Sequence, residues 1–122
     1  MNGLLGFGRY LYAIVILIFG SFHFMNAGQM AGMAPFGGEF MIYFTGLALV
    51  AAAVSIFLGK LDKLSGVLLA LMLILFALMV HAPGLADEAS QQTSMSNMLK
   101  DLGLAGGALM SAALAKDSSV IG

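Results

Sequence analysis

Four long apolar stretches, separated by short polar segments, limit how this chain can fold. They cover about residues 10–25, 40–58, 64–82 and 97–115, and a helix needs about 20 predominantly apolar residues to cross a bilayer. A helix also satisfies its own backbone hydrogen bonds in lipid, and none of the stretches alternates as the strands of a membrane barrel do. The sequence therefore predicts an all-α fold, a single transmembrane domain in which four spans form an antiparallel four-helix bundle.

The composition excludes several classes of protein. Of the 122 residues, 61% are hydrophobic and 9% are charged, whereas about 25% of the residues in a soluble domain are charged. A chain this small could not bury so much apolar surface on its own. Its five Lys and Arg residues form no basic patch for nucleic acid. Cysteine is absent, which excludes disulfides and cysteine nucleophiles, and the lipid bilayer is the partner that this composition predicts.

The basic residues predict the orientation of the spans. Arg9 precedes the first stretch, Lys60 and Lys63 lie between the second and third, and Lys116 follows the fourth, so that only Lys100 falls on the other side. Because Lys and Arg are enriched in cytoplasmic loops, the N- and C-termini are expected in the cytoplasm. The end of the first stretch lacks the small residues of a signal-peptide cleavage site, so we expect it to be a retained span.

Ionisable residues gather at the opposite, non-cytoplasmic end of the predicted bundle. His23 lies near the end of the first stretch, Glu39 at the start of the second, His81 at the end of the third, and Lys100 and Asp101 near the start of the fourth. Ionisable groups within spans are costly and usually face the bundle interior or a water-filled cavity. These five residues are therefore the candidate ligand-binding residues.

A purely structural explanation of the same residues stays open. Glu39 and Asp101 lie near helix N-termini, where the macrodipole favours a carboxylate. The Lys100 side chain can extend to the membrane surface, and a histidine at the end of a span can lie among lipid headgroups. The polar cluster is thus either a binding site or a set of interfacial anchors.

Copper and haem fit the residues at this end of the molecule less well than an organic ligand does. Thioethers and imidazoles are ligands for Cu(I), but methionine also fills irregular apolar gaps. Two histidines on different helices could be axial ligands of haem. The spacing of the methionines is not repetitive as in a metal-capture tract, and we predict neither a copper nor a haem site. The methionines concerned are Met25, Met30, Met33, Met95 and Met98.

Small residues in the fourth stretch predict close helix packing. Gly103 and Gly107 form a GxxxG pair, which allows the backbone of a second helix to approach closely. That second helix belongs either to the same bundle or to another copy of the chain.

Several tracts together match a known pattern. They are Phe19-Gly20-Ser21-Phe22-His23-Phe24, Met33-Ala34-Pro35, the glycine- and leucine-rich second stretch, the short lysine-containing hairpin and the segment 97–109. In these tracts the chain resembles the DoxX-like family of small four-helix membrane proteins. The resemblance implies a multi-pass protein of the bacterial inner membrane. Some members of that family are associated with thiosulfate:quinone oxidoreduction or with membrane oxidoreductase complexes, but no agreed catalytic set exists to transfer.

Two functions follow as hypotheses. The first is a redox-associated subunit that binds a quinone or similar lipophilic molecule near its periplasmic face. His23, His81 or Lys100 would donate hydrogen bonds to the quinone headgroup, and Asp101 or Glu39 would orient an imidazole or accept a proton. The second is a non-catalytic subunit that assembles a homo-oligomer or a larger membrane complex. No self-contained catalytic motif assigns an enzyme activity to the chain, and a transporter fits less well because no inverted repeat is present.

Overall fold

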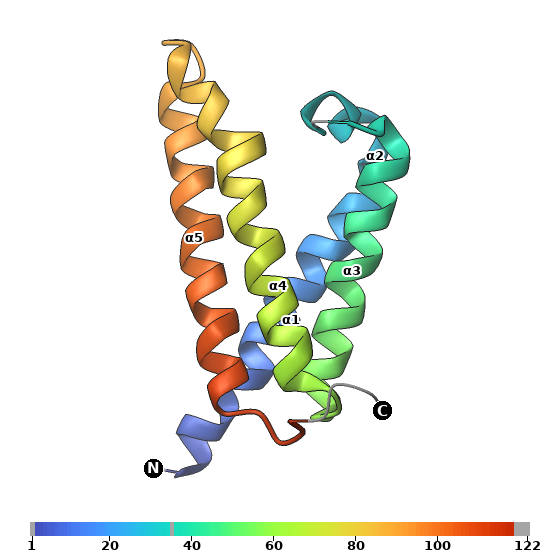
Figure 1. Cartoon of the computed structure of the whole chain (residues 1–122), viewed down its shortest axis with the longest axis vertical. Helices are drawn as coiled ribbons and strands as arrows, with labels where there is room; N and C mark the ends of the chain where they lie inside the picture. The colour runs from blue at the N-terminus through green and yellow to red at the C-terminus, as the bar shows by residue number, and fades with distance from the viewer. Residues whose placement is uncertain (1, 35, 119–122) are drawn as a thin grey trace.

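A computed structural model describes residues 2–34 and 36–118, and its regular structure there is entirely helical. The all-α prediction is confirmed. Four long helices alternate in direction (Figure 1), and short helical segments extend or connect them. The long helices are α1 (Asn2–Met25), α3 (Gly38–Leu58), α4 (Asp62–Phe76) and α5 (Gln91–Ala113). The short segments are α2 (Ala27–Met30), η1 (Ala31–Met33), η2 (Ala77–His81) and η3 (Ala82–Ala86).

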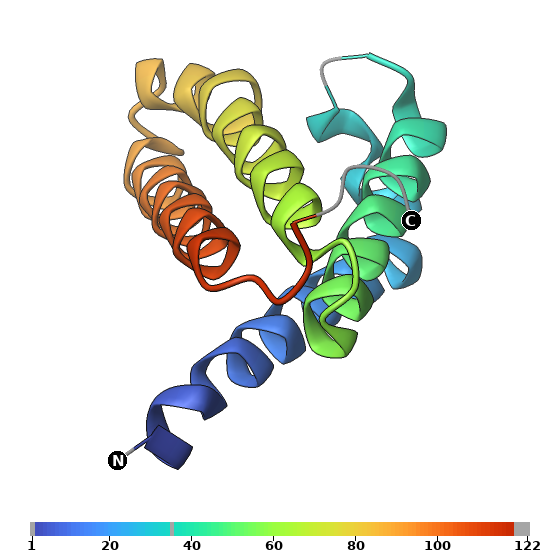
Figure 2. The same ribbon diagram turned by 60° about the horizontal axis from the view of Figure 1, so that its bottom comes forward.

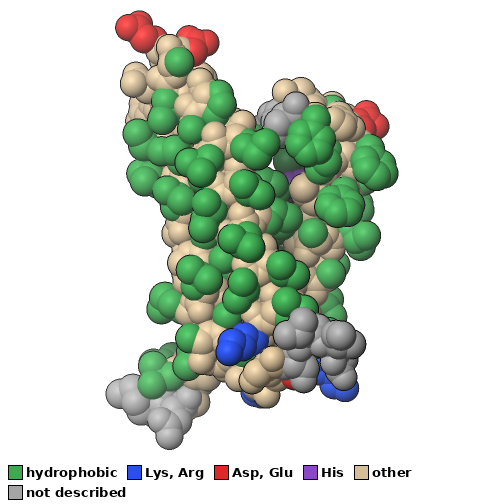
Figure 3. All heavy atoms as spheres, viewed as in Figure 1, with side chains coloured by type: hydrophobic (Ala, Val, Ile, Leu, Met, Phe, Trp, Pro, Cys, Tyr) green, Lys and Arg blue, Asp and Glu red, His purple; other side chains and the backbone are tan. Residues whose placement is uncertain are grey.

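Three helical stretches are long and apolar enough to cross a membrane. They are Gly3–Met25, Gly38–Leu58 and Asp62–Ala86, the last formed by α4, η2 and η3 together. Large apolar side chains point outward from them, as at Leu47 and Leu68, which are 60% and 55% exposed. Such surfaces need a lipid or protein partner, and they cover the long helices in Figure 3. These features are those of a membrane protein.

Helix α5 is long but less apolar than the other three. It begins at Gln91, several residues before the predicted span, and its first turns carry polar side chains that include Asn97 and Lys100. Helix length depends on backbone hydrogen bonds and packing rather than on apolarity alone, so helices extend beyond the apolar stretches. A fourth membrane span and the cytoplasmic location of the termini remain predictions.

The long helices form two pairs, α1 with α3 and α4 with α5, rather than an evenly packed bundle (Figures 1 and 2). Glycines allow the close approach within each pair. A Cβ atom on Gly20 of α1 would lie 2.8 Å from Val50 Cγ2 of α3, and one on Gly66 of α4 would lie 2.8 Å from the Ala108 carbonyl oxygen of α5. Such contacts are typical of helices that pack closely in membranes.

The core lies where the two pairs meet. Its largest buried side chains are Ile16 of α1 and Leu49 and Ile56 of α3, each at most 1% exposed. Leu69 and Leu73 of α4 belong to the same cluster. The pairs separate beyond this cluster, toward the end of the molecule that holds α2 and η3 (Figure 1).

A buried carboxylate joins the two pairs at the other end. Asp62, at the start of α4, is completely buried, and one of its oxygens lies 2.7 Å from Nη2 of Arg9 in α1. The backbone N–H groups of Lys116 and Asp117, which follow α5, each donate to it at 2.9 Å. Arg9 also donates to the Ile56 carbonyl oxygen of α3. We call these five residues the Asp62 network, and it connects all four long helices.

The Asp62 network predicts a large cost for removing the carboxylate. In Asp62→Ala the Arg9 guanidinium and two backbone N–H groups lose their partner, so we expect the free energy of unfolding to fall by about 3–5 kcal/mol. Thermal or denaturant unfolding in detergent, followed by circular dichroism, measures the change. The control is Glu88→Ala, which removes an exposed carboxylate at the other end and should unfold like wild type. Equal stability of Asp62→Ala and wild type would contradict the role of the network.

Candidate functional site

A cavity of about 330 Å³ lies between the two helix pairs, at the end opposite the Asp62 network. All four long helices contribute to its wall, which is mostly apolar. The hollow between the pairs is visible in Figure 3, with a histidine inside it. The polar residues of the wall are His23, Thr45, His81, Asn97, Lys100 and Asp101.

A π-helical turn brings His81 to the cavity. The segment η2 continues α4 with one wider turn over Ala77–His81, and such turns are rare and frequent at functional sites. His81 is 9% exposed there, and its Nε2 lies 3.0 Å from Oδ2 of Asp101 in α5, which is 4% exposed. The ion pair or hydrogen bond between them is therefore almost fully shielded from solvent.

Lys100 connects this pair to α1. Its Nζ lies 3.5 Å from Oδ1 of Asp101 and 4.8 Å from the centroid of the Phe19 ring. The ammonium balances the Asp101 charge, and the aromatic face adds a cation–π contact. The Lys100 side chain is 41% exposed, so this group stands at the rim of the site rather than in its interior.

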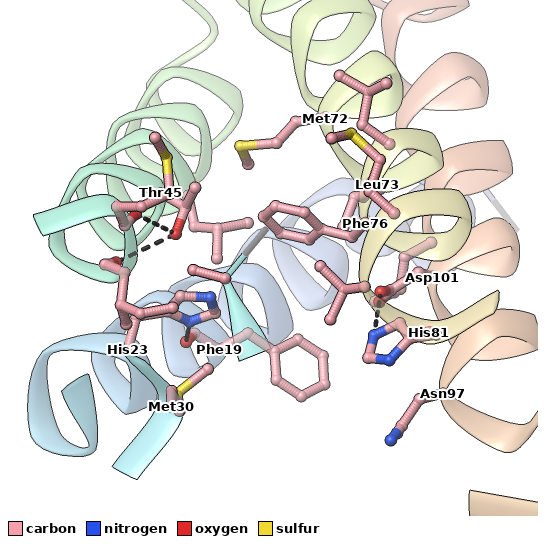
Figure 4. A pocket seen from close by; sticks show the side chains of 18 of the residues that line it. Phe19, His23, Met30, Thr45, Met72, Leu73, Phe76, His81, Asn97 and Asp101 are labelled. Atoms are coloured by element: carbon pink, nitrogen blue, oxygen red, sulfur yellow. Dashed lines mark hydrogen bonds and ion pairs between the residues drawn. The ribbon is translucent and has the colours of Figure 1, made fainter. Parts of the chain in front are cut away.

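His23 of α1 occupies the opposite wall. Its Nδ1 lies 2.8 Å from the Phe19 carbonyl oxygen one turn earlier. Its ring stacks on Phe76 of α4, with centroids 6.3 Å apart and an interplanar angle of 21°. Figure 4 shows His23 on one side of the pocket and His81 with Asp101 on the other, with Phe76 between them.

Four of the five candidate residues thus line one cavity: His23, His81, Lys100 and Asp101. Glu39 is not among the lining residues. It is exposed in the first turn of α3, and a Cβ atom on Gly28 of α2 would lie 3.2 Å from its Oε1. A carboxylate in a first turn is favoured by the helix dipole, which accounts for Glu39 without a ligand.

The methionines at this end of the molecule lie in different places. Met30 lines the cavity, whereas Met25 and Met95 are exposed and Met98 is partly buried. The side chain of Met33 is outside the described residues. Within residues 2–34 and 36–118, no three His, Asp or Glu residues lie close enough together to hold a metal ion.

The two glycines of the GxxxG pair have different surroundings. A Cβ atom on Gly107 would lie 2.7 Å from Cε1 of Tyr12 in α1, whose hydroxyl donates to the Leu104 carbonyl oxygen. Around Gly103 no heavy atom of the described residues lies within 4 Å of such a Cβ position. Of these two glycines, Gly107 therefore serves a close contact among the described residues and Gly103 does not.

Sequence reasoning missed two features of the structure. Thr45 lies in the cavity wall and is 8% exposed. The signal for it in the sequence is a hydroxyl side chain within an apolar stretch. The sequence predicts for Arg9 only a role in orientation, and it assigns none to Asp62. These two residues form an ion pair. The signal for it in the sequence is an acidic residue between two lysines, at the same predicted end of the molecule as Arg9.

Comparison with protein-family models, curated proteins and solved structures finds no match to this chain. The resemblance to the DoxX-like family therefore stays a prediction, carried by the tracts quoted above.

Proposed function

We propose that this chain is a DoxX-like protein of the bacterial inner membrane that binds a quinone or similar lipophilic molecule as a redox-associated subunit. One observation carries the proposal: an apolar cavity between two helix pairs has His23, His81, Lys100 and Asp101 in its wall. A quinone-type molecule has the same division into a polar ring and an apolar tail.

The size and mouth of the cavity support a lipophilic ligand. Its volume of about 330 Å³ falls in the range of about 300–1,000 Å³ typical of small-molecule sites. Several lining residues are also large, apolar and strongly exposed, so the cavity wall continues into the apolar outer surface. A ligand could enter from the bilayer without crossing water. These residues are Phe36, Phe44, Leu75 and Met79.

The polar groups have separable roles in this proposal. Asp101 holds the His81 ring in a fixed orientation, as carboxylates commonly do for functional imidazoles. His23 and His81 contact the headgroup from opposite walls, and Lys100 closes the rim. The absence of cysteine from the sequence excludes a thiol as redox group.

Binding of a short-tailed benzoquinone or its hydroquinone to purified protein tests this proposal. We expect saturable binding by isothermal calorimetry or fluorescence quenching in detergent. Of these two probes, the one that wild type binds more tightly should bind the double variant His23→Ala/His81→Ala at least about tenfold more weakly, because two hydrogen bonds of roughly 1 kcal/mol each are lost. The control is Leu68→Ala, on the outer surface of α4, which should bind like wild type. Absence of binding to wild type, or equal binding to the double variant, would contradict the proposal.

A non-catalytic assembly subunit is the second candidate function. The observation that favours it is the open space around Gly103 and Gly106 of α5, where a Cβ atom would meet no described heavy atom within 4 Å. In lipid, a helix face with exposed glycines allows close approach of another helix.

The assembly hypothesis predicts a particle larger than one chain. Light scattering in mild detergent should give the mass of an oligomer or complex for wild type and the mass of one chain for Gly103→Leu/Gly106→Leu, because the leucines would keep a second helix at a distance. A control is Gly3→Leu, which has equally open space in α1. A wild-type particle with the mass of one chain would count against this function.

A further inference from the structure

His23 offers the cavity a lone pair rather than a hydrogen. Its Nδ1 lies 2.8 Å from the Phe19 carbonyl oxygen, and a carbonyl oxygen can only accept, so Nδ1 carries the hydrogen and donates it there. In a neutral imidazole with one nitrogen protonated, the other is an acceptor. In the neutral ring, Nε2 on the far side is therefore an acceptor, and it has no hydrogen-bond partner in the part of the chain that the structure describes.

Thr45 presents an acceptor in the same way. Its Oγ1 lies 2.9 Å from the Met41 carbonyl oxygen and 3.1 Å from that of Ile42. A hydroxyl has one hydrogen, and here it is directed to the backbone of α3. The lone pairs of Thr45 remain for a ligand. The next residue, Gly46, packs against Cβ of His23, so both acceptors belong to the wall formed by α1 and α3.

His81 presents the third acceptor, from the opposite wall. The Lys100 ammonium, 3.5 Å from Asp101, already balances the charge of that carboxylate, so a neutral His81 leaves the group of three without net charge. Nε2 then donates to Oδ2 of Asp101 at 3.0 Å. Nδ1 is left as an acceptor, with no hydrogen-bond partner among residues 2–34 and 36–118.

We infer that this cavity selects molecules that present hydrogen-bond donors on opposite sides of an apolar ring, and therefore binds the hydroquinone form of its ligand in preference to the quinone. The inference rests on the proposed function and specifies the ligand of the same site. Two hydroxyls of a hydroquinone match acceptors on the two walls. Quinone carbonyl oxygens would face lone pairs, and a site built around one hydrogen-bonding pattern discriminates strongly against a ligand that lacks it.

The remaining donors of the wall do not reverse this preference. The Lys100 ammonium pairs with Asp101, lies over the Phe19 ring and stands at the exposed rim, apart from the buried part of the wall. Asn97 carries both a donor and an acceptor in its amide, so it suits either form of the ligand. The buried polar groups thus decide the pattern.

Three probes of the same ring and tail test the inference on wild-type protein under anaerobic conditions: a short-tailed benzoquinone, its hydroquinone and the dimethyl ether of that hydroquinone. The ether keeps the reduced ring but has no donor. We expect the hydroquinone to bind about tenfold to a hundredfold more tightly than either of the others, equivalent to one or two buried hydrogen bonds.

Two substitutions test whether the acceptors on Thr45 and His23 cause the preference for hydroquinone. Thr45→Val keeps the side-chain shape and removes the hydroxyl, and His23→Phe keeps a ring against Phe76 and removes the nitrogen. Each should weaken hydroquinone binding about tenfold and leave quinone binding nearly unchanged. Ser21→Ala is the matched control, since its hydroxyl also donates one turn back along its own helix, to Leu17, but Ser21 does not line the cavity. Circular dichroism establishes that each variant is folded.

The outcomes separate the two proposals. Equal affinity for quinone and hydroquinone, or tighter quinone binding, would overturn the donor preference and leave the proposed function standing. Binding of none of the three probes would overturn both. Tighter hydroquinone binding that Thr45→Val and His23→Phe leave unchanged would also overturn the inference, because the preference would then come from other groups.

Discussion

The buried carboxylate of Asp62 is the constraint on which the arrangement of this molecule depends. A charge without access to water is tolerated only when it is paired and hydrogen-bonded, and Asp62 obtains its partners from α1 and from the segment after α5. Arg9 extends the same interaction to the end of α3. Both helix pairs are thereby fixed to each other at one end, and their separation at the opposite end is what leaves room for a cavity.

The chemistry of the cavity follows from this division into pairs. Each pair contributes one histidine, and each histidine is fixed by an acceptor from its own pair: His23 by the Phe19 carbonyl and His81 by Asp101. The imidazoles therefore do not bond each other, and each keeps one nitrogen for a ligand. Apolar side chains around them extend to the outer surface, so a lipophilic molecule is the ligand class that matches both features.

The helices were predictable from the sequence because long apolar stretches favour them, and their alternating direction predicts which residues lie at the same end of the molecule. His23, His81, Lys100 and Asp101 share one end for this reason and line one cavity, whereas their role in binding stays a prediction. Depth does not determine the direction of a side chain, and Glu39 lies at the right end of the molecule but outside the cavity wall. The pairing of Arg9 with Asp62 and the exposure of Thr45 to the cavity depend on how helices pack, which periodicity does not reveal.

A structure determined in native lipid tests the central claim most directly. We expect elongated density between the two helix pairs, with its broader end within hydrogen-bonding distance of His23 and His81 and its tail directed toward the apolar mouth at Phe44 and Leu75. Helix pairs closed upon each other, with His23 and His81 buried against protein atoms and no density between them, would contradict it.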